Sequence, residues 1–142
     1  MKIVKVSAKY DKTQENGSVK KVTEHYLVDA MSIAEAESKA VNYLTPYISG
    51  ELATTAVQLS KVEEVINAED ADKLYLARVG FITIDEKTAK EKRTINQWLV
   101  GGTDFNDAYE HILREFNSFI TSAPELISLS ESNFVAFIPY KS

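Results

Sequence analysis

Two pairs of side chains are candidates for binding chemistry, because each combines a cation with a hydrogen-bonding group four residues further on. The first pair is Lys21 and His25, and the second is Arg93 and Gln97. Alternate residues of an extended chain share a face, so both members of a pair lie on one side of a strand. A cation beside an imidazole or an amide can contact phosphate oxygens, so we predict that these four residues bind a ligand. An ordinary polar sheet face also explains them.

Other kinds of site have weaker support in the sequence. The chain has no cysteine and only two histidines, His25 and His111, so a metal site would need carboxylate ligands whose spacing the sequence does not show. Helix capping explains Asp104 and Asp107. A turn that requires small residues explains Gly101-Gly102, although this pair could also expose backbone N–H groups to an anion. We therefore predict a protein without catalytic activity, metal or cofactor.

An internal repeat relates the two candidate pairs. An offset of 72 residues carries Tyr26-Leu27-Val28 onto Trp98-Leu99-Val100, and the same offset carries the first pair onto the second. Apolar positions fall on apolar positions over most of the chain, which is typical of a tandem duplication. We predict a single domain over residues 1–142, with repeat one at 1–70 and repeat two at 73–142.

Each repeat has the pattern of a strand, a hairpin, a second strand, a helix and a third strand. In the first copy an alternating run around residues 4–10 is followed by a return strand over 19–29. Ser32 and Glu35 form a capping box that begins the helix, and the third strand covers 54–66. The second copy repeats the order over 74–84, 91–100, a helix from Phe105, and 126–140. This ββαβ duplication predicts an α+β fold with pseudo-twofold symmetry, in which two helices pack on antiparallel sheets or on one shared sheet.

The alternation of the return strands suggests which face is buried. Even positions carry the aromatic residues Tyr26 and Trp98, so we assign the even face to the core beneath the helices. The odd face then presents the four candidate residues. If the faces are reversed, Tyr26 and Trp98 become stacking platforms beside Lys20 and Lys92.

Composition limits the possible partners and compartment. A net charge of −5 over 142 residues argues against a protein that coats DNA indiscriminately, although a local basic patch remains compatible with it. The lack of cysteine favours a reducing compartment, so we expect a cytoplasmic protein. No apolar run has the length of a signal peptide or a membrane span, so we expect no membrane partner.

Several motifs occur in a fairly specific order along nearly the whole chain. They are residues 22–30 (VTEHYLVDA), Ser32 with 35–37 (EAE), 45–51 (TPYISGE), and 81–87 (FITIDEK) with Glu91-Lys92. In these motifs the chain resembles a domain-of-unknown-function family of small proteins from gut Bacteroidales and their tailed phages, including crAss-like phages. The resemblance implies a phage or phage-derived protein in the cytoplasm and carries no known site residues.

These observations together favour a non-enzymatic protein that binds nucleic acid or a nucleotide during phage replication or host takeover. One alternative is a protein-interaction module, such as an inhibitor or adaptor that pairs an exposed strand edge with a host protein. Another is a sponge for a small symmetric nucleotide, because a pseudo-twofold surface suits a pseudo-twofold ligand. The sequence does not predict the oligomeric state.

Overall fold

The elements follow one another in the same order twice along the chain. The computed structural model describes residues 2–120 and 123–140, so residues 1, 121–122 and 141–142 of the predicted repeats lie outside the described part. The first series is β1 (Lys2–Thr13), β2 (Val19–Ala30), α1 (Ile33–Leu44), a 3-10 helix (Thr45–Tyr47), β3 (Leu52–Leu59) and β4 (Val62–Ile66). The second is β5 (Lys73–Ile84), β6 (Glu91–Gly102), α2 (Phe105–Phe116), β7 (Glu125–Glu131) and β8 (Phe134–Ile138). The predicted α+β class and duplicated arrangement are confirmed.

The chain divides into two units that exchange their last strands. Unit 1 contains residues 1–60 and 133–142, and unit 2 contains residues 61–132. The sheet of unit 1 has the order β3-β1-β2-β8, and the sheet of unit 2 has the order β4-β6-β5-β7. Strand β4 therefore follows β3 in sequence but pairs with β6, while β8 follows β7 but pairs with β2.

This exchange differs from the prediction in two details. The runs predicted as single third strands, 54–66 and 126–140, are each divided into two strands that belong to different sheets. Each sheet is mixed, because β2–β8 and β4–β6 are parallel whereas the other pairs are antiparallel. Equivalent serines mark the two divisions: the Ser60 N–H donates to the Ile3 carbonyl at 2.9 Å, and the Ser132 N–H donates to the Leu74 carbonyl at 2.9 Å.

Each helix begins at the predicted cap. The Ser32 hydroxyl accepts the Glu35 N–H at 3.1 Å, and the Asp104 carboxylate accepts the Asp107 N–H at 2.8 Å. In the second helix the Asp107 carboxylate also accepts the N–H of Thr103, the residue before the cap, at 2.9 Å. The two cap bonds satisfy the Glu35 and Asp107 N–H groups, which have no partner within their helices.

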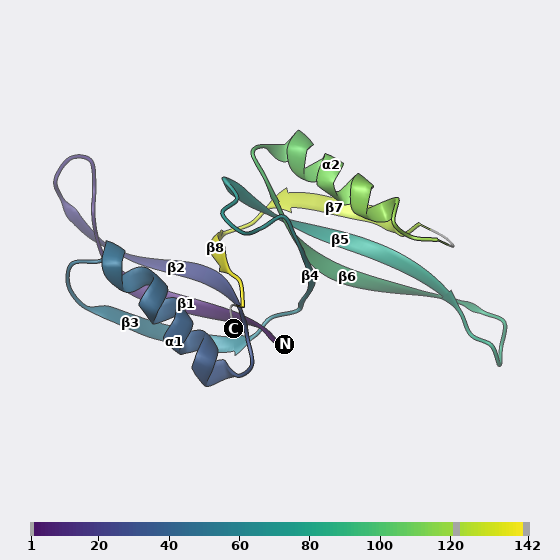
Figure 1. Cartoon of the computed structure of the whole chain (residues 1–142), viewed down its shortest axis with the longest axis horizontal. Coiled ribbons are helices and arrows are strands. Elements are labelled where there is room, and N and C mark those ends of the chain that lie inside the picture. Colours follow the sequence, from purple (N-terminus) through teal and green to yellow (C-terminus); the bar gives the residue numbers. More distant parts are fainter. Residues whose placement is uncertain (1, 121–122, 141–142) are drawn as a thin grey trace. The chain divides into compact units, whose positions relative to one another are not determined.

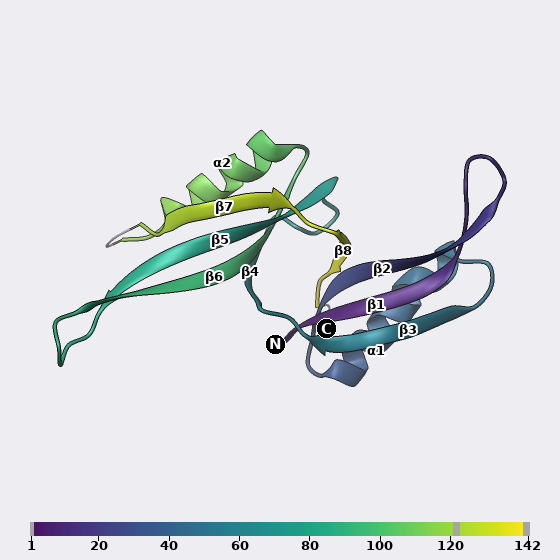
Figure 2. The ribbon, with the colours of Figure 1, turned by 180° about the vertical axis from the view of Figure 1, so that it is seen from behind.

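Both helices cover one face of the sheet in their own unit. In unit 1, α1 lies across β1, β2 and β3, and in unit 2, α2 lies across the sheet on one side (Figure 1). Seen from behind, the strands of unit 1 lie in front of α1 (Figure 2). Tyr26 and Trp98 are each only 2% exposed and belong to the clusters beneath the helices. The even face is therefore the helix-covered face, as predicted.

The two cores differ in the size of their residues. Helix α1 buries the small side chains of Ala36 and Ala40, followed by Leu44. Helix α2 buries Ala108, Ile112 and Phe116, and its Phe116 ring lies 5.6 Å from the ring of Trp98. The larger side chains give unit 2 the more extensive aromatic packing.

Candidate functional site

The face of the unit 1 sheet that lies opposite α1 carries a group of cations. Directly opposed residues of an antiparallel pair share a face, and the register pairs Ser7 with His25, Lys9 with Thr23, and Asp11 with Lys21. Lys5 lies on the same side of β1, two residues before Ser7. We call the side chains of Lys5, Lys9, Lys21 and His25 the basic face. It contains both candidates predicted in the first repeat.

A hydrogen bond holds the imidazole of the basic face in place. His25 Nδ1 lies 2.7 Å from Ser7 Oγ, and Ser7 is only 6% exposed. Burial, followed by the charge of Lys5, lowers the pKa of His25 below its usual value. The ring is therefore neutral at neutral pH and can form a hydrogen bond with a ligand. Because Ser7 is buried, this Ser–His contact positions the ring and offers no accessible nucleophile.

An aromatic ring from the exchanged strand lies next to these cations. Phe134 of β8 is aligned with His25 in the parallel pair, and its ring is half-buried. Lys5 Nζ lies 6.0 Å from the centre of the Phe134 ring, at the outer limit of a cation–π contact. Rings and cations on an open sheet face are what single-stranded nucleic acid needs for base stacking and phosphate contacts.

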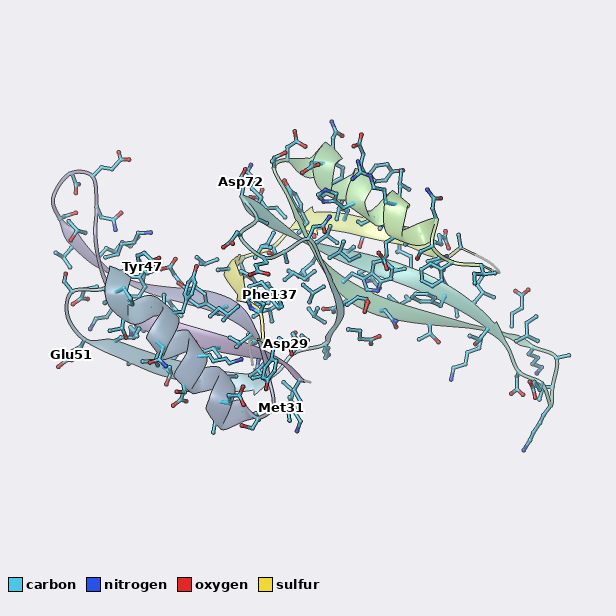
Figure 3. The ribbon with its side chains drawn as sticks, in the orientation of Figure 1. Asp29, Met31, Tyr47, Glu51, Asp72 and Phe137 are labelled. Carbon is cyan, nitrogen blue, oxygen red and sulfur yellow. The ribbon has the colours of Figure 1, made fainter. Side chains whose placement is uncertain are left out.

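A depression lies at the end of the basic face that is nearer the β1–β2 hairpin, beside Lys9 and Lys21. It has a volume of about 150 Å³, and its lining includes Lys9, Lys21, Asp11, Glu51 and Tyr10. Figure 3 shows Glu51 on the segment between α1 and β3. The two carboxylates offset part of the lysine charge at this end. The Tyr10 hydroxyl donates to the Glu24 carboxylate. Burial, followed by this bond, raises the pKa of Tyr10 to about 12.

The opposite end of the same face is closed. Leu27, which is an odd-position residue of β2, is fully buried, and so is its counterpart Leu99 in β6. Lys5 lies directly opposite Leu27 and is half-buried, whereas the more exposed part of the basic face runs from His25 to Lys9 and Lys21.

The two candidates from the second repeat lie in a different chemical environment. Arg93 Nη2 lies 2.9 Å from Glu125 Oε2, so the charge of Arg93 is offset by an ion pair. The guanidinium crosses β5 above Gly80, where a Cβ would lie 3.3 Å from Arg93 Nε. Gln97 is half-buried and lies directly opposite Arg78. Lys21 with His25 and Arg93 with Gln97 thus share a face within each unit, but the two faces differ in charge.

Three members of this site were not among the predicted residues: Lys5, Lys9 and Phe134. The alternation of Lys5, Ser7 and Lys9 already places these residues on one face of the first strand, so sequence reasoning could have included both lysines. No local pattern places Phe134 beside His25, because the contact depends on the strand exchange.

The Gly101-Gly102 pair is explained by close packing. A Cβ at Gly101 would lie 2.0 Å from the Asn67 carbonyl oxygen, and one at Gly102 would lie 2.7 Å from the Ala108 nitrogen. The space in front of these glycines is therefore filled by backbone. This result supports the requirement for small residues over an anion-binding role.

The described part of the chain contains neither a metal-holding group of side chains nor a membrane-spanning helix. Within residues 2–120 and 123–140, no group of three or more His, Cys, Asp or Glu side chains is arranged to hold a metal ion. None of the helices in the described part of the chain combines the length and apolar character needed to cross a bilayer.

Comparison with known proteins identifies a family without an assigned activity. The family model described as "Domain of unknown function (DUF4494)" matches residues 4–140, which is nearly the whole chain. No curated protein and no solved structure matches the chain.

Proposed function

Because the chain belongs to the DUF4494 family, whose description assigns no activity, we propose its function from its own surface: unit 1 binds single-stranded nucleic acid on the basic face, without catalysis. The observation that carries this proposal is the grouping of Lys5, Lys9 and Lys21 around His25 and Phe134, on the sheet face that α1 leaves uncovered. A mononucleotide offers the same chemistry in a shorter form and binds more weakly because it makes fewer phosphate contacts.

The three lysines supply the electrostatic part of binding. Each cation that meets a phosphate releases a condensed counterion, and for single strands the slope of log K against log salt is about −0.7 per contact. Three contacts correspond to a slope of about −2, so affinity falls by about 20-fold between about 50 mM and about 200 mM salt. The overall charge of −5 opposes binding elsewhere on the chain and thereby favours a local site.

Binding of a fluorescent single-stranded oligonucleotide over a salt series tests the proposal. The Lys9→Ala/Lys21→Ala variant should weaken binding and reduce the salt slope by about 1.4. The Lys87→Ala/Lys90→Ala variant is the matched control, because it removes the same charge from exposed positions in the β5–β6 turn. A wild-type chain that does not bind at the lowest salt would refute the proposal, as would equal loss in both variants.

The ion pair of unit 2 provides a second discriminating comparison. Arg93 is paired with Glu125, whereas Lys21 lies on a face with two further lysines. We therefore expect Lys21→Ala to weaken oligonucleotide binding and Arg93→Ala to leave it nearly unchanged. The chemical difference between the two faces also reduces the support for a symmetric nucleotide ligand, which would need matched surfaces.

The biological setting is part of the same proposal. The resemblance to proteins of gut Bacteroidales and their phages supports a role in phage replication or host takeover, and the lack of cysteine supports action in the cytoplasm. Measuring when the gene is transcribed during infection would test this setting. Transcription in step with genome replication is the expected result, and transcription only with the structural genes would contradict it.

A protein-interaction function is the second candidate, and the β3 edge favours it. Strand β3 lies at the edge of its sheet and has eight residues without a charge, whereas its counterpart β7 begins and ends with glutamate. An uncharged edge can accept an additional strand from another protein. The Ala56→Lys variant separates the two functions, because a lysine there blocks strand addition but adds a cation beside the basic face. If the Ala56→Lys variant no longer captures a host protein but binds the oligonucleotide more strongly, the result favours the edge function.

A further inference from the structure

Exposed isoleucines gather on the face of the unit 2 sheet that lies opposite α2. Ile82 is 58% exposed, Ile84 is 67% exposed and Ile95 is 43% exposed. The register places Ile95 beside Gly80 and Ile82 beside Arg93, so these side chains occupy one continuous face of β5 and β6. Ile127 of β7 reaches the same place, because its Cδ1 would lie 3.0 Å from a Cβ at Gly80. We call Ile82, Ile84, Ile95 and Ile127 the isoleucine face.

The fold itself does not require apolar residues at these positions. The corresponding face of unit 1, aligned from equivalent strand ends, carries Asp11, Thr13 and Thr23 where unit 2 carries the three exposed isoleucines. The strands follow equivalent orders in the two sheets, and in each unit a helix packs on the other face of the sheet. Packing within unit 2 therefore does not account for the isoleucines, and a partner that covers them does.

The charges on this face are balanced. Arg93 and Glu125 form an exposed ion pair across Gly80, and the same face carries the exposed side chains of Arg78, opposite Gln97, and Glu91, opposite Ile84, so each added cation is matched by an anion. An apolar face with no excess of positive charge is unsuited to a phosphate backbone. A face that carries both signs can pair with a copy of itself, because a twofold axis brings each charge near its opposite.

We propose that the isoleucine face binds the same face of a second copy of this chain, in a twofold-symmetric dimer. The exposed apolar patch is on the order of 300 Å², the size at which a patch on a monomer is often functional. A stable dimer buries about 800 Å² per partner, so this smaller patch gives a weak dimer with a dissociation constant on the order of 100 µM. Such a dimer carries two copies of the basic face, which, resting on the function proposed above, offers a long nucleic acid two binding sites.

Sedimentation velocity of the full chain, from about 10 µM to about 1 mM, tests the dimer. We expect the average mass to rise toward that of a dimer and to stay raised at high salt, since apolar contacts hold the two copies together. In the Ile82→Lys/Ile84→Lys variant the dissociation constant should rise by about tenfold or more, because the centre of the patch is lost. The matched control is Val19→Lys, which replaces an apolar residue that is 64% exposed in the hairpin of unit 1.

Three results would overturn the proposal. The first is a chain that remains monomeric over the whole concentration range. The second is an equally strong dimer in the isoleucine variant. The third is a dimer lost in Ala56→Lys but retained in the isoleucine variant, which would place the contact at the β3 edge. Oligonucleotide binding by a strictly monomeric chain would leave the proposed function intact and remove only the dimer.

Discussion

Replacing Gly101 with alanine should destabilise unit 2 strongly, because the space for a side chain is already occupied. A Cβ at this position would lie 2.0 Å from the Asn67 carbonyl oxygen, 2.8 Å from the Asn67 carbonyl carbon and 2.6 Å from the Ala71 Cβ. The φ of Gly101 is outside the left-handed region, so the requirement is one of space and not of backbone conformation.

The size of the stability loss in Gly101→Ala follows from the atoms that a new Cβ would have to displace. Ordinary van der Waals contact begins near 3.4 Å, so the Asn67 backbone would have to retreat by about 1.4 Å. The segment that contains Asn67 is constrained, because Asn67 and Asp70 both adopt positive φ and the Ala71 N–H donates to the Ala68 carbonyl. Overpacking typically lowers the free energy of unfolding by about 1–3 kcal/mol. Because the obstacle here is a rigid backbone, we expect Gly101→Ala to lower it by about 3 kcal/mol or more. Domains of this kind have a free energy of unfolding of about 5–15 kcal/mol, so the loss is a large fraction.

Urea denaturation followed by tryptophan fluorescence measures this effect. Trp98 is the only tryptophan of the chain and is buried in the core of unit 2. The control is Gly80→Ala, whose new Cβ meets the ends of two flexible side chains, Ile127 Cδ1 at 3.0 Å and Arg93 Nε at 3.3 Å. We expect this control to change the free energy of unfolding by less than about 1 kcal/mol, since a glycine within a strand also carries an entropic cost.

A Gly101→Ala chain with the stability of the wild type would refute this reasoning. Equal destabilisation by Gly101→Ala and Gly80→Ala would also refute it, because a backbone obstacle should cost more free energy than the movable side chains around Gly80.

Two further predictions concern titration. The raised pKa of Tyr10 means that the folded state favours the protonated phenol, so its contribution to stability is present below pH 10 and is lost as pH rises toward about 12. The Tyr10→Phe variant should therefore lose less stability at alkaline pH. Its absorbance titration should also lack one late-titrating phenol of the seven tyrosines. The lowered pKa of His25 means that the folded state favours the neutral ring, so stability is full above the ordinary histidine pKa of 6.5 and falls as pH drops below it. His25→Gln should make the urea midpoint less dependent on pH between about 7 and about 5, and an unchanged pH dependence would contradict the assignment.

Local patterns predict much of this fold because the interactions that decide them are local. Alternation correctly places Tyr26 and Trp98 beneath the helices, and the spacing of Ser32 from Glu35 and of Asp104 from Asp107 correctly predicts the helix starts. The strand exchange could not be predicted in this way. The run that contains β4 has the same alternation whether it pairs within its own repeat or with β6, and the choice depends on packing between distant segments.

The same distinction applies to the candidate site. Residues of one hairpin, such as Lys9 and Lys21, can be placed on one face from their register alone. The neutralisation of Arg93 depends on Glu125, which lies two strands away, and on a glycine between them that leaves room for the contact. The presence of Phe134 beside His25 depends on the exchanged strand. Such contacts have a large sequence separation, so no short motif indicates them.

The exchange of β4 and β8 has a consequence for the order in which a nascent chain can mature. All strands of unit 2 lie between residues 61 and 132, so every segment of this unit has been synthesised while unit 1 still lacks β8. Until residues 134–138 emerge from the ribosome, β2 lacks its neighbour β8, even though β1, β2 and β3 all precede unit 2 in the sequence. Unit 1 is therefore completed after unit 2, although most of it is synthesised earlier, and a premature stop between residues 132 and 134 would leave unit 2 whole while exposing the β2 edge of unit 1.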